Sequence, residues 1–349
     1  MALDTQTLRD TVQHNCDISD ARHASDYTLC IYLLKMRELF RWEKGLGFEN
    51  HFPKEEIGSW LTEREQRWEN LENEEFRRIA ISGSQLDPFD TNAVNDRLLG
   101  EGFVYSGGIG RRGAPHFFLA RLERQIDHDD YRILVAGKEL ARDLTSPPAM
   151  TLGKTIYVRQ ESLTRMIWER FQEWRWHQYE NAMQRALSYY DFDNDIPGAL
   201  GAMMETEIEP VVQHEVGEVQ AGALLGDQWK VMVMAASRSR AEIMARAVRD
   251  HLADTLTTLP ALLDSGAEAS LHFYMANLTA MRKDLFPGFG IAYDEWASGG
   301  GLDAMREVVE AGRAHWLETA LGMLDIHEAH GGDPQRPLER YVESRRLTM

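Results

Sequence analysis

The sequence predicts a mainly α-helical protein of the α+β class, a helical bundle with a small antiparallel β-sheet inserted in its N-terminal half. Long stretches repeat apolar residues at the three- and four-residue spacing of amphipathic helices. Residues 102–137 instead contain runs of β-branched and aromatic residues around a glycine-rich loop. The 349 residues suffice for two domains. We expect residues 1–150 to hold the N-terminal helices and the sheet, and residues 151–349 to form the bundle.

Acidic residues outnumber basic ones, with 56 Asp and Glu against 38 Lys and Arg and a net charge of −18. Nucleic acids and anionic membrane surfaces are bound through clustered basic residues, so neither is an expected partner. The partners that remain are a small-molecule substrate and, in a homo-oligomer, a second copy of the chain.

The two cysteines, Cys16 and Cys30, are too few for a disulfide framework. The N-terminus lacks a basic segment followed by an apolar run. No apolar stretch approaches the roughly 20 residues that span a bilayer. These features predict a cytoplasmic protein.

The N-terminal half is expected to begin with polar, irregular residues 1–18. Residues 19–44 follow as one helix that is apolar on two sides, which is typical of a central helix in a bundle or of a helix between layers. Glu38 falls on one of these apolar sides. Residues 54–80 are dense in Glu and Arg and predict a solvated helix pair or one long amphipathic helix. Its inner side consists of Trp60, Leu61, Trp68 and Leu71.

Two connections are expected within the sheet, at the glycine-rich residues 107–113 and at the turn 127–130. A dinucleotide-binding loop would open a helix, whereas this glycine-rich loop leads to Pro115 and another strand. It is therefore interpreted as a hairpin connection. Arg111 and Arg112 on it are candidates to contact an acidic ligand.

The chain after Pro147 and Pro148 is predicted to be helical. The expected helices cover residues 162–190, 200–226, 237–259, 271–281 and 302–329. Pro210 is expected to kink the second of these helices. Residues 283–300 are interpreted as a loop, and the tail beyond residue 331 is polar.

The helix at residues 200–226 carries the strongest candidates for chemistry. Its apolar stripe consists of Ile208, Val211, Val212, Val219 and Ala223. Glu215 falls in the middle of this stripe, and Glu207, His214 and Glu218 lie along one edge. A carboxylate at a core position is costly unless it is paired, protonated or bound to a metal. The pattern His214-Glu215-x-x-Glu218 therefore indicates a metal site or a buried ion pair.

Neighbouring elements are expected to add imidazole and carboxylate groups. On the next helix, His251 borders the apolar stripe and Asp254 lies one step further round, while Asp250 is expected to point away. A short helix beyond it carries His272. The predicted metal ligands are His214, Glu215, Glu218, His251, Asp254, His272 and Glu207. Such mixed ligands suit zinc, iron or manganese, and the metal stays undecided.

A metal-dependent enzyme acting on a small molecule is the function that this pattern favours. Of the two catalytic candidates, Glu215 and Glu218, the unligated one would serve as general base toward metal-bound water or substrate. The protease motif H-E-x-x-H is not matched, because Glu218 replaces its second histidine. Hydrolysis and oxidation at a di-iron centre are not separated by the sequence.

A non-catalytic helical binding or scaffold protein is the alternative. In it, Glu215 pairs with a buried Arg or His, and the polar groups only fix the register of the helices. Such a protein should expose a broad apolar or aromatic patch. The candidates for that patch are Phe286, Phe289, Tyr293 and Trp296.

Two further sets of potential ligands are weaker. The first set is His14, Cys16, His23 and Cys30. Its spacing matches no compact zinc motif. The second set is His315, Glu318, His327, Glu328 and His330. Its terminal position favours a solvated helix face.

Three blocks of the sequence resemble a known family. They are NCDISDARHASDYTLCIYLLKMRELFRWE, GGIGRRGAPHFFLARL and LHFYMANLTAMRKDLFP. The family is a conserved group of bacterial proteins without an assigned activity, and the resemblance covers most of the chain. It implies a soluble bacterial protein, and it carries over no catalytic residue and no cofactor.

Overall fold

The computed structural model describes residues 3–110, 113–330 and 335–348, so Arg111 and Arg112 lie outside the described residues. The chain folds into two compact units, an N-terminal unit of residues 1–168 and a C-terminal unit of residues 169–349. The boundary falls inside helix α5, Gln160–His177. Across the described ranges, no helix is both long and apolar enough to cross a membrane.

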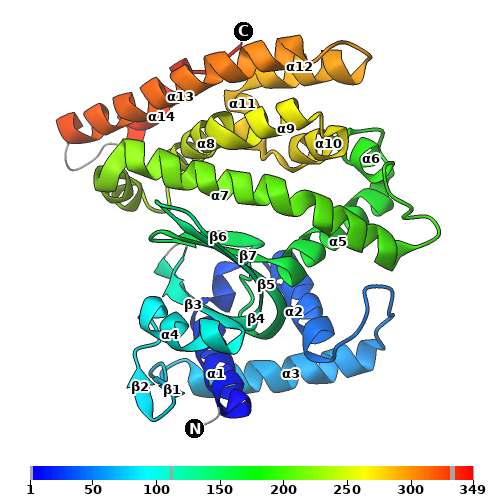
Figure 1. The fold of residues 1–349 in the computed structure, drawn as a ribbon, viewed down its shortest axis with the longest axis vertical. Helices are drawn as coiled ribbons and strands as arrows, with labels where there is room; N and C mark the ends of the chain where they lie inside the picture. Colours follow the sequence, from blue (N-terminus) through cyan, green and yellow to red (C-terminus); the bar gives the residue numbers. More distant parts are fainter. Residues whose placement is uncertain (1–2, 111–112, 331–334, 349) are drawn as a thin grey trace. The chain divides into compact units, whose positions relative to one another are not determined.

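The N-terminal unit combines helices with two β-sheets (Figure 1). Its helices are α1 (Thr5–His23), α2 (Leu29–Glu43), α3 (Lys54–Leu71) and α4 (Thr91–Leu98). Its strands are β1 (Ile79–Ile81), β2 (Ser84–Leu86), β3 (Phe103–Ile109), β4 (Pro115–Asp127), β5 (Arg132–Arg142), β6 (Ala149–Leu152) and β7 (Thr155–Arg159). The short strands β1 and β2 form a hairpin of their own, which was not expected.

The larger sheet has the strand order β3-β4-β5-β7-β6 and is visibly curled (Figure 1). Antiparallel pairing of β3, β4 and β5 confirms the strands expected in residues 102–137, including the hairpin at the glycine-rich loop. The expectation of a purely antiparallel sheet confined to that stretch is wrong, because β7 pairs with β5 in parallel and β6 pairs with β7. The β-branched and aromatic residues 155–158 were overlooked as a strand.

Helix α1 overturns the expectation that residues 1–18 are irregular. Asp4 caps the helix by accepting the backbone N–H of Thr7 at 3.1 Å. One apolar residue per turn is buried against the sheet. These residues are Leu8, Val12 and Cys16. A stripe this narrow does not stand out in a segment that is otherwise polar.

The single helix expected at residues 19–44 is interrupted before α2 begins at Leu29. The start of α2 is exposed rather than buried between layers, and Leu29 exposes 71% of its surface. Glu38 is buried, as its place on an apolar side required, and pairs with Arg41 at 3.1 Å. The helix expected at residues 54–80 ends at the last residue of α3, ahead of strand β1.

The C-terminal unit is helical (Figure 1). Its helices are α6 (Ala182–Leu187), α7 (Ile196–Ala235), α8 (Arg240–Ala253), α9 (Leu259–Ser265), α10 (Glu268–Asn277), α11 (Ala280–Leu285), α12 (Pro287–Ala297), α13 (Asp303–His330) and α14 (Gln335–Ser344). A π-helical turn, Asp254–Thr258, joins α8 to α9. Helices α8, α9 and α10 form a middle layer, with α7 on one side and α13 on the other (Figure 1). This layered arrangement differs from the simple bundle that was expected.

The loop expected at residues 283–300 is largely helical, because Pro287 starts α12 in the first-turn position that proline favours. Of the four aromatic residues expected in an exposed patch, only Trp296 is partly exposed. Phe286, Phe289 and Tyr293 are buried in the core of the unit.

Three other expectations for the C-terminal half need correction. The helix expected at residues 162–190 is divided into α5 and α6. Helix α7 continues through Pro210 and departs from helical geometry at Gly226 instead. The polar tail contains α14, which buries Leu338 and Val342.

Candidate metal centre on helices α7 and α8

Helices α7 and α8 approach each other closely beside the π-helical turn. A Cβ atom at Gly217 would lie 2.3 Å from the carbonyl oxygen of Ala253, so this approach requires glycine. The hydroxyl of Thr257 donates to the carbonyl oxygen of Gln213 at 2.6 Å and joins the same two segments. Polar residues of α7 are thereby brought beside those of α8 and of the turn.

Three side chains gather here with potential metal-binding atoms close together. One such atom each of His214, Glu218 and Asp250 lies within 4.8 Å of the other two, and no other group of this kind is found among the described residues. Asp250, which was expected to point away from the apolar stripe of its helix and was not predicted as a ligand, is therefore one of the three donors. The apolar stripe of α8 faces the middle of the unit, but α8 also packs its flank against α7, and Asp250 lies on that flank.

Asp254 orients the ring of His214. The two residues are joined by a hydrogen bond of 2.7 Å between His214 Nδ1 and Asp254 Oδ1. Because Nδ1 is occupied, Nε2 is the nitrogen left for a metal ion. A carboxylate on the opposite ring nitrogen is the usual arrangement behind a metal-bound histidine. Asp254 also opens the π-helical turn, a backbone irregularity that often marks functional sites.

The carboxylate of Asp254 is buried, and both of its oxygens have hydrogen-bond or ion-pair partners. Thr258 Oγ1 and Tyr274 OH each donate to it at 2.8 Å, and Arg282 forms an ion pair with it. Burial opposes its ionisation, but the charges of Arg282 and His214 outweigh burial and hold its pKa well below the usual range. Asp254 is therefore ionised at neutral pH.

Glu218 has one oxygen engaged and one oxygen open. Its Oε2 atom pairs with the Arg249 guanidinium at 2.7 Å. Its Oε1 atom is buried and has no hydrogen-bond partner within the described ranges. Burial raises the pKa of this carboxyl, although Arg249 and His214 counteract the effect. A buried carboxylate oxygen without a partner is a position where a cation would be stabilised.

Negative charge outweighs positive charge around the three donors. The carboxylates are Glu215, Glu218, Asp250 and Asp254, and the arginines are Arg249 and Arg282. Burial opposes the charged form of the His214 ring, but Asp254, followed by Glu218 and Glu215, raises its pKa to about 10. Without a metal ion, His214 is therefore protonated at neutral pH. A divalent ion at Nε2 would take the place of that proton.

His251, a predicted ligand, lies in the core instead. Its ring stacks on Trp316 with 4.7 Å between centroids, and its Nε2 atom lies 3.0 Å from the carbonyl oxygen of Arg282. Burial and the Arg282 charge lower its pKa to about 3, so the ring is neutral.

His272 and Glu207, two further predicted ligands, have partners of their own away from the three donors. His272 Nδ1 is hydrogen-bonded to Tyr293 OH at 2.8 Å, and Ser270 donates to Glu207 at 2.8 Å. Burial raises the pKa of Glu207 to about 7. The spacing along α7 therefore located His214 and Glu218, whereas the more distant residues could not be placed by spacing.

Several residues of the site were not singled out from the sequence. They are Arg249, Asp250, Tyr274 and Arg282. The last two come from α10 and α11 and reach Asp254 only through tertiary packing. No local spacing could have identified them.

The potential ligands near the N-terminus do not gather. Cys16 is buried and donates to the carbonyl oxygen of Phe117 at 3.3 Å, whereas Cys30 is exposed. His14 pairs with Glu74 at 3.1 Å. Each of these groups has an ordinary structural explanation.

The set near the C-terminus is likewise engaged in packing. His315 Nε2 lies 2.6 Å from the carbonyl oxygen of Arg345, and Glu318 pairs with the Arg345 side chain at 2.9 Å. These contacts attach the C-terminal segment to α13.

Comparison with known proteins identifies a family for this chain but assigns no activity to it. Residues 7–159 match the N-terminal domain model, and residues 164–345 the C-terminal domain model, of a family described as "Family of unknown function (DUF6866)". No curated protein and no solved structure matches the chain. Because the two matches together span nearly the whole sequence, the chain belongs to the DUF6866 family.

Proposed function

We propose that the protein is a metal-dependent enzyme acting on a small molecule, with a divalent ion held by His214, Glu218 and Asp250. The observation that carries the proposal is the convergence of these three donors within 4.8 Å. The hydrogen bond from His214 Nδ1 to Asp254 and the open Oε1 of Glu218 support it, because they leave donor atoms for a cation.

The donor set favours hydrolysis over di-iron oxidation. Di-iron sites in helical proteins take a histidine from each of two helices together with several carboxylates. The cluster offers a single imidazole, His214, which suits one ion with three protein ligands and open positions for water and substrate. A bound ion would supply Lewis-acid polarisation and an acidified water. Glu215, outside the donor set, is the candidate general base.

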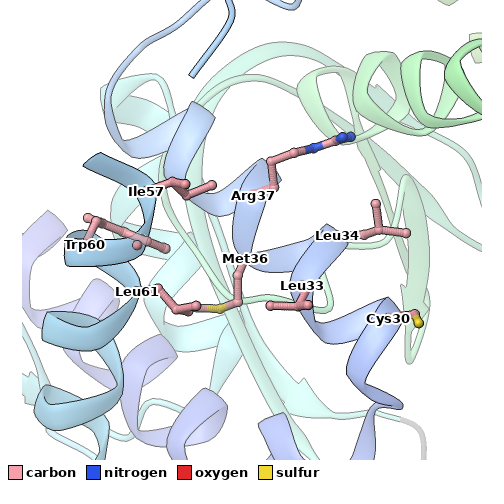
Figure 2. A pocket seen from close by; sticks show the side chains of 9 residues that line it. Cys30, Leu33, Leu34, Met36, Arg37, Ile57, Trp60 and Leu61 are labelled. Carbon is pink, nitrogen blue, oxygen red and sulfur yellow. The ribbon is translucent and has the colours of Figure 1, made fainter. Parts of the chain in front are cut away.

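A binding or scaffold role is the second candidate, supported by an apolar groove between α2 and α3 of about 500 Å³. Figure 2 shows Leu33, Met36 and Leu61 projecting toward this groove. The exposed side chains Leu29 and Leu34 extend the apolar surface along α2. The groove lies in the N-terminal unit and is independent of the metal proposal.

The metal content of the untagged protein tests the leading proposal. Protein from metal-replete medium should contain close to one equivalent of zinc, manganese or iron per chain by elemental analysis. His214→Ala and Asp250→Asn should each lose the metal, because each removes one of three ligands. Circular dichroism checks that the variants are folded.

Asp227→Asn is the matched control, because Asp227 lies on α7 but is exposed, 93% of its side chain being accessible. This variant should keep the metal. A wild-type protein without metal after growth and titration with all three ions would overturn the proposal. Metal that is retained by both ligand variants would also overturn it.

A further inference from the structure

A second pocket lies in the C-terminal unit, away from the metal donors. It measures about 510 Å³ and is lined by residues of α6, α10 and the end of α12. Small-molecule sites commonly measure about 300–1,000 Å³. On α10, His272 faces this pocket and Tyr274 contacts Asp254. Two residues differ by about 200° around a helix, so the pocket and the metal centre lie on different sides of α10.

A positively charged residue, Arg185, and a negatively charged residue, Glu268, line this pocket and do not form an ion pair with each other. Arg185 forms no ion pair with any described residue, and its contact is with the Tyr293 hydroxyl at 3.5 Å. Glu268 also lines the pocket, where it accepts a hydrogen bond from Tyr189 OH at 2.7 Å. The Arg185 side chain is exposed, so its guanidinium is open to an anionic group of a ligand.

His272 offers a second donor beside Arg185. The Tyr293 hydroxyl accepts from Arg185 and is hydrogen-bonded to His272 Nδ1 at 2.8 Å. Because Nδ1 is engaged by this hydroxyl, Nε2 is the ring nitrogen left for a ligand, and it donates a hydrogen bond in the tautomer whose Nδ1 accepts from Tyr293. Burial, with the Arg185 charge, lowers the pKa of this ring, so it is neutral.

Two aromatic side chains, Trp296 and Tyr189, also line the pocket, together with Ser188, Ala297, Gly299 and Gly300. The rings of Trp296 and His272 lie 4.7 Å apart, and Trp296 also packs against Tyr293. Tyr189 is half exposed, and its ring centroid lies 6.1 Å from that of His272. Such surfaces favour a flat, apolar group on the ligand.

We infer that this pocket binds a small zwitterion of amino-acid size that carries an aromatic side chain. Its carboxylate contacts Arg185 and His272, its ammonium group contacts Glu268, and its ring packs against Trp296 and Tyr189. The separation of the two protein charges across one pocket carries this inference, since a ligand with both charges satisfies both groups. The inference does not depend on the metal centre.

Three related probes test the inference by isothermal titration calorimetry on the full chain. L-phenylalanine carries both charges, 3-phenylpropionate lacks the ammonium group and 2-phenylethylamine lacks the carboxylate. L-phenylalanine should bind at least about tenfold more tightly than either analogue, because each analogue leaves one protein charge without a partner. No binding of L-phenylalanine at millimolar concentration, or equal binding of all three probes, would overturn the inference.

Two variants test which protein residue contacts each charged group of the ligand. Arg185→Gln should remove the advantage of L-phenylalanine over 2-phenylethylamine, and Glu268→Gln should remove its advantage over 3-phenylpropionate. Arg240→Gln is the control, because Arg240 is paired with Glu343 outside the pocket. It should leave all three affinities unchanged. Variants that fold by circular dichroism and bind the three probes as the wild type does would refute the assignment.

Discussion

Both units bury charged side chains, and the two clusters differ in their balance of charge. In the N-terminal unit, Glu139 pairs with Arg159 at 2.8 Å and lies 3.8 Å from Arg142. Ser162 donates to the same carboxylate at 2.7 Å. All four side chains are buried, so one carboxylate meets two arginines away from water.

The cluster at His214 has the opposite balance, because carboxylates outnumber arginines and an imidazole is present. An arginine keeps its proton under all ordinary conditions, whereas a histidine can exchange its proton for a metal ion. The first cluster is therefore an ion network with fixed positive charge. In the second cluster, part of the positive charge is exchangeable, and this difference makes it the better candidate for a functional site.

Removal of the central carboxylate should have the largest effect in both clusters. Asp254→Asn leaves the largely buried Arg282, and Glu139→Gln the buried Arg159, without its charge partner. The free energy of unfolding should fall by about 3–5 kcal/mol in each case, as measured by urea denaturation. The exposed control Asp227→Asn should change it by less than about 0.5 kcal/mol.

The zinc affinities of Asp254→Asn and Glu139→Gln should differ. It should bind Glu139→Gln as it binds the wild type, but Asp254→Asn should bind it about 10–100-fold more weakly, because the His214 ring loses its orienting carboxylate. Equal zinc affinity of the two variants would show that the clusters do not differ in the way proposed.

Glu207 extends the comparison to a buried carboxyl that has a hydroxyl partner, Ser270, and a pKa raised by burial to about 7. The folded protein holds this proton more tightly than the unfolded chain, whose ordinary value is 4.5. The contribution of the protonated Glu207 carboxyl to the free energy of unfolding is therefore fully present below pH 4.5, the pKa in the unfolded chain. This contribution is lost as pH rises through about 7, the pKa in the folded protein. Glu207→Gln should raise the free energy of unfolding at about pH 8 by about 3 kcal/mol.

The gain from Glu207→Gln should disappear at about pH 4, where the wild-type carboxyl is protonated when folded. Glu205→Gln, an exposed position on the same helix, is the control and should show no comparable gain. Urea denaturation at both pH values measures the difference. A stability gain that is independent of pH would mean that Glu207 is not the titrating group.

The close helix approach beneath the His214 cluster should be sensitive to a single methyl group. Gly217→Ala places a Cβ atom against the Ala253 carbonyl oxygen and should lower the free energy of unfolding by about 1–3 kcal/mol. It should also weaken zinc binding, because the donors lie on the two segments that must separate.

Gly222→Ala is the matched control on the same helix, because its Cβ would meet only Arg249 at 3.8 Å. Alanine is the better helix former, so this variant should be neutral or more stable by up to about 1 kcal/mol. Thermal unfolding followed by circular dichroism compares the two. If Gly217→Ala is as stable as Gly222→Ala, the close approach does not set the geometry of the site.

The sequence predicted those parts of the fold that depend on local periodicity. The stripe of α7 placed His214 and Glu218 together because residues four apart share one helix face. Strands β3 to β5 were found because turn residues separate them. The parallel pairing of β7 with β5 was missed because no local signal marks a long-range contact. Asp250 was missed because a single apolar stripe cannot show that α8 is covered on its flank as well.

The last prediction distinguishes the two clusters by whether a proton is exchanged for a metal ion. The pKa of His214 is raised to about 10, so the free protein carries a proton there at neutral pH, and zinc must displace it. The apparent zinc affinity should therefore rise about tenfold for each pH unit between about pH 6 and about pH 8. Calorimetry in buffers with different ionisation enthalpies should detect the release of about one proton per zinc ion.

His214→Gln provides the comparison for this measurement, because it removes both the proton and the nitrogen donor. Any residual zinc binding by this variant should lose the steep pH dependence, since Glu218 and Asp250 remain as the donors. Arg142 and Arg159 of the Glu139 cluster keep their protons in this range, so Glu139→Gln should keep the wild-type slope. A wild-type affinity that does not change with pH would mean that zinc does not replace the His214 proton, and the two clusters would then have the same purely structural role.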